Sequence, residues 1–183
     1  FGSIEGSLFN GFRGVSVKIL FDRERKKSVL IDGVAIRKIG ELLGRTCAVF
    51  FSPNELKLVK ESPEDRRKFL NIAISQTNKR YFYLLARYEK VLASRNKLLK
   101  SSHNIEVIKE TIDIWDRSLC ELAEKIFQER KKFVDEMVPY AEKAHEYLSS
   151  GSENLKIEYK SDFKDGYAQN MYKYLEKKFR KRL

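Results

Sequence analysis

The sequence predicts an α+β protein that is mainly α-helical, in which a short antiparallel β-meander precedes a long antiparallel helical hairpin. Two observations predict this class. Apolar residues alternate with polar ones between tight-turn signals in residues 1–36, as in half-buried strands. From residue 62 onward, apolar residues recur every three or four positions, as on amphipathic helices. We expect three parts: a β-rich part at 1–61, a helical arm at 62–150, and a strand with a basic helix at 151–183.

The N-terminal meander is predicted from short apolar runs separated by turn residues. The expected strands and turns are Ile4–Phe9, a turn at Asn10-Gly11, Val15–Phe21, Val29–Ile31, a turn at Asp32-Gly33, and a return through Val34 to Ile36. Residues 37–44 have apolar side chains at helical spacing and end at Gly44, which indicates a short helix. The unbroken apolar run Cys47–Phe51 is typical of a strand buried on both faces.

Two short helices separated by a turn are predicted after Ser52. Pro53 suits the first turn of a helix, because a proline there lacks an N–H that would be unpaired in any case. Ser62 can cap the second helix, and Pro63 fits its first position. On these residues alone, Ser52 is expected to cap the helix that begins at Pro53.

The long hairpin is predicted from two apolar stripes. The first runs along residues 77–100, where Arg95 and Asn96 interrupt it and must either find partners or reach water. The second is a heptad seam from Ile105 to Ile126, and Pro139 is expected to kink or end its helix. The first helix is basic and the second is acidic, so we expect them to pack against each other in an antiparallel pair.

The C-terminal part begins after the Ser149-Ser-Gly151 stop. Leu155, Ile157 and Tyr159 alternate as in a strand. Residues 167–183 then predict an amphipathic helix with one apolar and one basic face. The residues expected to face inward are Tyr167, Met171, Tyr174 and Leu175.

Composition favours a polyanionic partner and argues against several other classes. The 183 residues carry a net charge of +11, which suits nucleic acid; a well-solvated surface is the alternative. No apolar run approaches the ~18 residues of a membrane span, so no membrane association is expected. Cys47 and Cys120 lack metal-site spacing and are expected to be buried thiols of a reducing, cytoplasmic protein.

No catalytic or metal-binding constellation is predicted. The sequence has no G-x-x-x-x-G-K-[ST] loop, so it lacks that cradle for phosphates. His103 and His145 have no nucleophile or ligand set around them and are expected at the surface. Arg66 and Arg67 suit either ion pairing or phosphate contact.

The densest basic positions are the candidates for contact with DNA, with a solvated charged face as the alternative for each group. They are Lys79, Arg80, Arg87, Lys90 and Lys97 on the first long helix, and Lys173, Lys177, Lys178 and Arg180 on the last one.

Residues 53–71 resemble the signature of the RecF family of bacterial recombination and gap-repair ATPases. The matching positions are Pro53, Leu56, Leu58, Val59, Ser62, Pro63, Arg66, Arg67, Phe69, Leu70 and Asn71. Glu61 stands where the family pattern has glycine. Further matches follow at Arg95-Asn96 and Trp115-Asp116, and the resemblance covers roughly the whole chain.

The resemblance implies an ABC-type ATPase head with a helical arm, of which this chain is an internal piece without Walker A or ABC-signature motifs. It implies ATP and Mg²⁺ in the full-length protein, an ATP-dependent homodimer on duplex DNA near single-strand gaps, and cooperation with RecR, RecO and RecA that supports the SOS response. Ser52 resembles the position of the nucleotide-sensing glutamine of related SMC heads. Alone, the piece is expected to be inactive.

Two further functional classes stay open. The chain could be a helical adaptor that docks a repair partner such as RecR without touching DNA. A stand-alone small enzyme is disfavoured, because the motifs for one are missing.

Overall fold

The structure is a computed structural model that describes residues 2–9, 14–22, 24, 26–52, 57–60, 62–101, 105–163 and 165–180. The chain divides into two compact units, Phe1–Phe82 and Tyr83–Leu183. The first contains a four-stranded antiparallel sheet and the second consists mainly of helices. The predicted class, α+β and mainly α with an N-terminal antiparallel sheet, is confirmed. The three-part division at residues 61 and 150 stays a prediction.

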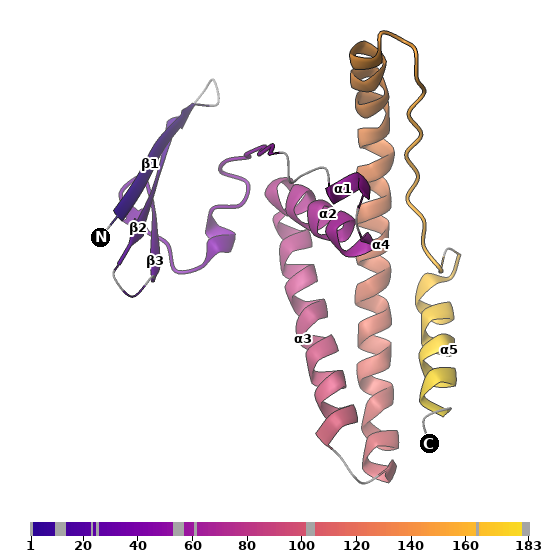
Figure 1. Cartoon of the computed structure of the whole chain (residues 1–183). Helices are drawn as coiled ribbons and strands as arrows, with labels where there is room; N and C mark the ends of the chain where they lie inside the picture. Colours follow the sequence, from indigo (N-terminus) through magenta and orange to yellow (C-terminus); the bar gives the residue numbers. More distant parts are fainter. Residues whose placement is uncertain are drawn as a thin grey trace. The chain divides into compact units, whose positions relative to one another are not determined.

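The sheet of the first unit is a simple meander with the order β1-β2-β3-β4 (Figure 1). The strands are β1 (Gly2–Phe9), β2 (Gly14–Phe21), β3 (Lys27–Ile31) and β4 (Val34–Ala35). Ile4 pairs with Ile19, and Ile19 pairs with Val29. Because paired side chains of an antiparallel sheet point to the same side, these three form an apolar face, while Glu5 and Lys18 form an ion pair (2.9 Å) on the other.

The turn between β3 and β4 has the conformation that its sequence predicts. Asp32 and Gly33 have φ values of 51° and 79°, and both positive values are required in a type I′ hairpin turn. The Asp32 carboxylate also accepts a hydrogen bond from the backbone N–H of Ser16 (2.9 Å), which ties the turn to β2. The Asn10-Gly11 turn lies outside the described residues.

The segment between the sheet and the helices differs from the prediction in two places. Residues 37–44 form no α-helix, and a 3-10 turn, η1 (Ile39–Glu41), stands there. The carboxylate of Glu41 accepts hydrogen bonds from the N–H groups of Arg37 and Lys38, which satisfies donors that an α-helix would leave unpaired. The run Cys47–Phe51 is not a strand, and Val49, Phe50 and Phe51 are exposed.

The reason is that a strand needs a neighbour for its backbone hydrogen bonds, and none of the four strands of the described sheet pairs with residues 47–51. Gln76 holds this stretch instead. Its side-chain carbonyl accepts from the N–H of Ala48 (2.7 Å), and its backbone carbonyl accepts from that of Gly44 (3.2 Å). Cys47, expected to be buried, is exposed.

The helices of the first unit are short, and α2 is capped at both ends. They are α1 (Lys57–Lys60), α2 (Pro63–Thr77) and the first residues of α3 (Lys79–Ser101). Asn78 joins α2 to α3: its N–H donates to the carbonyl of Ile74 (2.8 Å), and its side chain accepts from the N–H of Tyr81 (3.1 Å). One residue therefore ends one helix and begins the next.

The second unit contains the rest of α3, the long helix α4 (Ile105–Ser149) and α5 (Tyr167–Arg180). Figure 1 shows α3 and α4 side by side in opposite directions, with α5 beside α4. The predicted antiparallel hairpin is therefore confirmed. The predicted seam is buried at Ile108, Ile112, Leu119, Leu122 and Ile126.

Helix α4 continues through Pro139, contrary to the prediction that this residue kinks or ends it. Pro139 is exposed, so water can hydrate the carbonyl that a proline leaves without its helical partner. The helix ends ten residues later in a Schellman motif, in which the N–H of Gly151 donates to the carbonyl of Glu146 (2.9 Å) and Ser150 has a φ of 53°.

Residues 154–161 form no strand, although Leu155, Ile157 and Tyr159 alternate as one would. The segment runs back along α4 in an extended conformation (Figure 1), held by side chains and not by a ladder. One residue of α5 also faces the other way: Tyr174, expected inside, is exposed, whereas Met171 and Leu175 pack on the core.

Candidate functional site

The three helices of the second unit meet in one hydrophobic cluster. Val91 of α3 and Leu119 and Leu122 of α4 are buried at its centre. Met171 and Leu175 of α5 pack against them. The partly buried side chains around this centre also include Leu84, Tyr88, Leu92 and Trp115. The cluster fixes the faces of α3 and α5 that remain for solvent.

A buried ion pair crosses the same seam. Arg95 of α3 donates through Nε to one oxygen of Asp116 on α4 and through Nη2 to the other (3.4 Å). The side chain of Arg95 is 12% exposed and that of Asp116 is 5% exposed. The pair settles the two possibilities left open for residues 95 and 96: Arg95 finds a buried partner, and Asn96 is exposed to water.

Cys120 lies one helical turn after Asp116 and is buried. Burial, together with the nearby Asp116 carboxylate, raises the pKa of its thiol to about 12. The thiol is therefore protonated at physiological pH and is a poor nucleophile.

A polar contact anchors α5 to α4 on the surface side of the cluster. Asp113 accepts hydrogen bonds from Arg117 (2.8 Å) and from the hydroxyl of Tyr172, and the Arg117 guanidinium lies 5.0 Å from the centre of the Tyr172 ring. Hydrogen bonds from Arg117 and Tyr172 lower the pKa of Asp113, and the bond to Asp113 raises the pKa of the Tyr172 phenol.

Aromatic contacts hold the returning segment and the start of α5 on α4. Phe127 of α4 stacks on Tyr167 with ring centres 4.8 Å apart, and Tyr159 lies 5.8 Å away. Phe163 meets Tyr167 edge to face at 5.5 Å. Such pairs contribute about 0.5–1.5 kcal/mol each beyond their buried area. They replace the hydrogen-bond ladder that a strand would have made.

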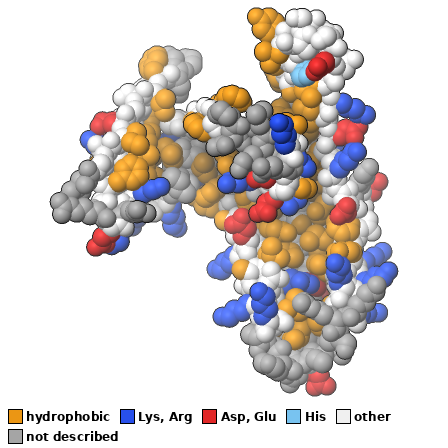
Figure 2. Space-filling view, in the orientation of Figure 1, with side chains coloured by type: hydrophobic (Ala, Val, Ile, Leu, Met, Phe, Trp, Pro, Cys, Tyr) orange, Lys and Arg blue, Asp and Glu red, His pale blue; other side chains and the backbone are white. Residues whose placement is uncertain are grey.

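The predicted DNA-contact residues are all exposed. Arg87, Lys90 and Lys97 lie on α3 within the second unit, and we call them the α3 basic face. Lys79 and Arg80 begin the same helix in the first unit and are exposed there. The α5 basic face consists of Lys173, Lys177, Lys178 and Arg180. Figure 2 shows Lys and Arg side chains on both flanks of the helical unit.

Several of these cations are available to an anionic ligand. Arg87, Lys90, Lys173 and Lys177 form no ion pair with any other residue that the structure describes. Arg180 is paired with Glu176 one turn earlier, and Lys178 lies 5.1 Å from the centre of the Tyr174 ring. The exposed Tyr174 ring therefore contacts a lysine of the α5 basic face and is not buried in the core.

Several family-signature residues connect α1, α2 and the start of α3 within the first unit. Ser62 caps α2, accepting from the N–H of Glu64 (3.2 Å), and Pro63 takes the first helical position, as predicted. Arg66 donates to the carbonyl of Leu58 (3.4 Å), which links α2 to α1. Asn71 accepts from the buried Tyr81 hydroxyl (2.7 Å).

The other signature positions differ in environment. Leu70 is buried and Leu58 half-buried, whereas Val59, Phe69 and Arg67 are exposed. Ser52 is half-buried at the end of the extended stretch before α1. Pro53, Leu56 and Glu61 lie outside the described residues, so the predicted cap of Ser52 on residue 53 is outside them as well. A nucleotide-linked site at these positions stays a prediction.

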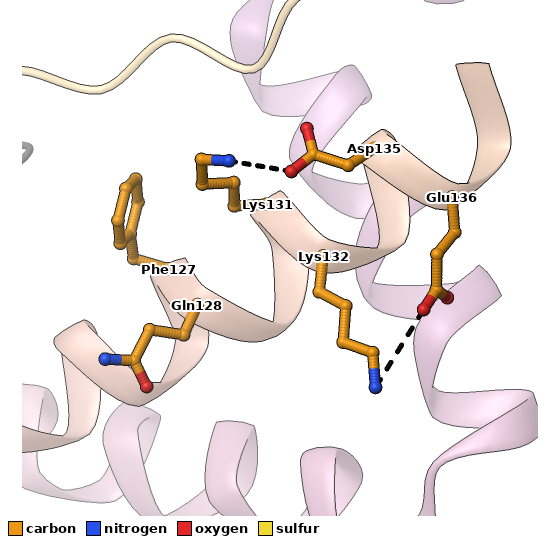
Figure 3. Close-up of a pocket in the computed structure, with 6 residues that line it drawn as sticks. All are labelled: Phe127, Gln128, Lys131, Lys132, Asp135 and Glu136. Atoms are coloured by element: carbon orange, nitrogen blue, oxygen red, sulfur yellow. Dashed lines mark hydrogen bonds and ion pairs between the residues drawn. The ribbon is translucent and has the colours of Figure 1, made fainter. Parts of the chain in front are cut away.

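The described surface also has a hollow on α4 that is no separate site. Figure 3 shows its lining, Phe127, Gln128, Lys131, Lys132, Asp135 and Glu136, all from one helix. Its cations are neutralised by Lys131–Asp135 (2.7 Å) and Lys132–Glu136 (3.9 Å) pairs. Among the described residues no group of three metal-ligating side chains occurs, and no helix is long and apolar enough to cross a membrane.

Sequence reasoning missed the partners of three residues. The sequence placed Arg95 in the apolar stripe but did not identify Asp116 as its partner, although Arg95-Asn96 and Trp115-Asp116 both match the family pattern. It did not foresee that Tyr172 reaches Asp113, or that Asn71 accepts from Tyr81. A carboxylate within a heptad seam was the available signal for Asp116, because such a charge needs a buried partner.

The chain is similar in sequence to curated proteins of one family. The DNA replication and repair protein RecF of Clostridium perfringens is 39% identical over 169 residues, which are 91% of this chain and 45% of the relative. The chain is homologous to RecF. The RecF proteins of Clostridium botulinum and Acetivibrio thermocellus are 38% and 36% identical over 165 and 143 residues. The chain spans about half the length of these RecF relatives, and no family model matches it.

Solved structures agree with the RecF relationship. The recombination mediator protein RecF with ATPrS, described within the RecFOR pathway, superposes with a TM-score of 0.77 at 26% identity. The match covers 96% of this chain and 48% of that one. A second RecF structure with ATP gives a TM-score of 0.76 at 24% identity, which supports the fold. The matched relatives are named DNA replication and repair proteins.

We predict that removing one partner of the Arg95–Asp116 pair lowers the free energy of unfolding, whereas replacing both partners with apolar residues does not. Arg95→Ala leaves a buried carboxylate alone and should lower the free energy of unfolding by about 3–5 kcal/mol, whereas Arg95→Met with Asp116→Leu should be neutral or stabilising. Urea unfolding measures both. Lys131→Met, in an exposed i,i+4 pair, is the control and should change it by less than about 0.5 kcal/mol. Equal losses in the single and double variants would contradict the prediction.

The two thiols should react very differently. In the native protein at pH 8, a disulfide reagent should modify the exposed Cys47 and leave Cys120 unmodified, because burial raises the Cys120 pKa to about 12. Cys120 should become reactive in denaturant. The free energy of unfolding should also fall as pH rises from about 9 toward 12, since the folded thiol keeps its proton and the unfolded one loses it. Cys120→Ala provides the control for this last measurement.

Proposed function

We propose that this chain is the DNA-binding arm and the adjoining switch segment of a RecF-type DNA-repair ATPase. The observation that carries the proposal is the pair of exposed basic faces on a helical unit whose other sides are committed to the core. The relatives supply the context: they are named for DNA replication and repair. The arm would hold duplex DNA near single-strand gaps by its phosphates.

The spacing of the cations suits a phosphate backbone. Lys173, Lys177 and Arg180 follow one line of α5 and span about 10 Å at 1.5 Å per residue. One DNA strand presents a phosphate about every 3.4 Å along the helix axis, so this line is about as long as three phosphates. Contacts from Lys and Arg to phosphate carry no sequence information, so binding through this line would not depend on sequence.

Charge distribution within the hairpin supports the same proposal. Residues 61–101 carry ten basic and four acidic groups, whereas residues 102–155 carry seven and 12. The acidic groups of α4 would repel phosphate. DNA would therefore be guided to the outer faces of α3 and α5 and away from the body of α4.

ATP and Mg²⁺ would bind at a site that this chain completes only in part. It has no glycine-rich phosphate loop, so the residues present do not form a nucleotide site by themselves. Ser52 would stand at the edge of that site and relay the nucleotide state through α1 and α2, which the Arg66–Leu58 contact couples. The structural neighbours are described as RecF with ATPrS and with ATP.

The assembly we propose is an ATP-dependent homodimer in a cytoplasmic repair pathway, in which RecR and RecO cooperate to load RecA. The description of the neighbours as mediators in the RecFOR pathway supports RecR and RecO as partners. The adaptor function, in which the arm docks RecR without touching DNA, is the second candidate. The exposed apolar end of α4 favours it, because such a surface suits a protein partner.

We predict that duplex binding depends on the basic faces. Arg87→Glu with Lys90→Glu, and Lys173→Glu with Lys177→Glu, should each weaken binding of the whole protein to a gapped duplex. Removal of one cation–phosphate interaction should make the log–log salt slope shallower by about 0.9. Fluorescence anisotropy across a salt series measures both quantities.

Lys131→Glu with Lys132→Glu is the matched control, because it makes the same charge change at cations already paired on α4. It should leave most of the affinity in place. A binding loss equal to that of the two test variants would point to net charge alone. No loss in either test variant, with RecR binding retained, would favour the adaptor.

The switch proposal has its own test. Ser52→Ala in the whole protein should lower kcat for ATP hydrolysis and leave unfolding nearly unchanged. Ser62→Ala should do the reverse, lowering the free energy of unfolding by about 1 kcal/mol through loss of the α2 cap. Unchanged hydrolysis in the Ser52 variant would reject a role for Ser52 in nucleotide sensing.

A further inference from the structure

The α5 basic face has an exposed aromatic ring at its edge. Tyr174 is 45% exposed. Lys177 and Lys178 follow it by three and four residues, so both lie one turn further along on the same side of the helix. The Lys178 ammonium lies 5.1 Å from the centre of the Tyr174 ring. An aromatic surface and two cations are therefore within reach of a single ligand.

The Tyr174 ring is held in one orientation. Phe163 meets it edge to face, with the ring centres 5.8 Å apart. Met171 and Leu175, on the neighbouring side of α5, pack on the hydrophobic cluster, which fixes the side that the helix presents to solvent. A ring that is already oriented loses little freedom when a ligand stacks on it, and this favours binding.

The charge on α5 suits a phosphate beside this ring. The helix contains four basic residues and one acidic residue, Glu176. Glu176 lies two positions after Tyr174, a spacing at which helical side chains do not face each other, and it is paired with Arg180. Asp162 and Asp165 precede the helix. Because the lysines lie on the C-terminal side of the ring, we expect the phosphates there.

The exposed tyrosines of α4 lack this setting. Tyr140 is 78% exposed and Tyr147 is 85% exposed. Lys143 is the only lysine or arginine within four positions of either of them in the sequence, whereas Tyr174 has three. Exposure of a ring alone therefore does not single out Tyr174. The combination of a ring with several cations does.

An exposed aromatic ring beside cations is an arrangement by which proteins bind single-stranded nucleic acid. A base stacks on the ring, and the cations hold the neighbouring phosphates. The paired bases of a duplex already stack on each other, so such a ring selects an unpaired base. Lysine has a flexible stem, so Lys178 can leave the ring for a phosphate when a base takes its place.

We propose that Tyr174 stacks an unpaired base where a duplex meets a single strand, while Lys177 and Lys178 hold the phosphates next to that base. This inference rests on the proposed DNA-binding function and adds to it. The basic faces hold phosphates of any DNA, whereas Tyr174 distinguishes the single-stranded side of a gap from the duplex. The stack accepts any base, because every base has a π-face.

The test compares two DNA ligands of the whole protein by fluorescence anisotropy. One is a blunt duplex, and the other is the same duplex with a single-stranded tail of about eight nucleotides. The tailed duplex should bind more tightly. Tyr174→Leu should weaken binding of the tailed duplex at least about fivefold, the lower end of the loss expected for one base–aromatic stack. It should leave binding of the blunt duplex nearly unchanged.

Two variants and one further measurement make the test specific. Tyr174→Phe keeps the ring and should keep the preference for the tail. Tyr147→Leu removes a more exposed ring from α4 and should change neither affinity. A 5-iododeoxyuridine in the tail, which couples to a stacked aromatic ring on irradiation, should cross-link to Tyr174. Circular dichroism and urea unfolding check that each variant is folded.

The outcomes separate this inference from the proposed function. Loss of all duplex binding in the unmodified protein would overturn both. Retained duplex binding would leave the proposed function in place, and three results would then overturn the role of Tyr174 alone. These are equal affinity for the tailed and blunt duplexes, a tail preference that Tyr174→Leu does not reduce, and equal losses in Tyr174→Leu and Tyr174→Phe, which would assign the effect to the hydroxyl and not to stacking.

Discussion

One buried contact, the ion pair of Arg95 with Asp116, constrains the helical unit, and we infer that it selects the register in which α3 and α4 pack. An apolar seam attracts two helices but does not by itself determine their register, since a shift by one heptad brings apolar residues together again. A buried guanidinium with one matching carboxylate makes every other register unfavourable, because both charges would lose their partner in the low-dielectric seam. The pair thus contributes specificity to a hairpin whose stability comes from Val91, Leu119 and Leu122 around it.

The register of α3 and α4 determines which side of α5 packs against them and which side faces solvent. Asp113 and Arg117, on either side of Asp116 along α4, receive Tyr172, and the adjoining cluster receives Met171 and Leu175. With these side chains committed, helical geometry turns the lysine side of α5 outward. The basic surface is therefore a consequence of packing. A change in the seam would move the cations without altering any of them.

Short-range patterns predicted most of the fold. The Ser62–Pro63 cap, the Asp32–Gly33 turn and the seam of α4 depend on residues within a few positions of each other, and each was predicted from the sequence. Contacts across long separations were not, such as Arg95 with Asp116 or Tyr172 with Asp113. Extended segments were also misjudged: residues 47–51 and 155–159 have strand-like composition, but a strand exists only where a neighbour supplies hydrogen bonds. Tyr174 was placed inside because it follows the apolar spacing, yet it lies beneath Lys178 at the surface. For the candidate site, the sequence identified the Lys and Arg residues, but it did not show which of them form ion pairs with neighbouring carboxylates.

The arm presents two surfaces that act through different physics. On α3 and α5, exposed cations attract phosphate by a field that salt screens within about 8–10 Å. At the end of α4, exposed apolar side chains offer area for burial, an interaction that salt weakens far less. One hairpin could therefore hold DNA along its sides and a protein at its end, and ionic strength would separate the two activities in a single preparation.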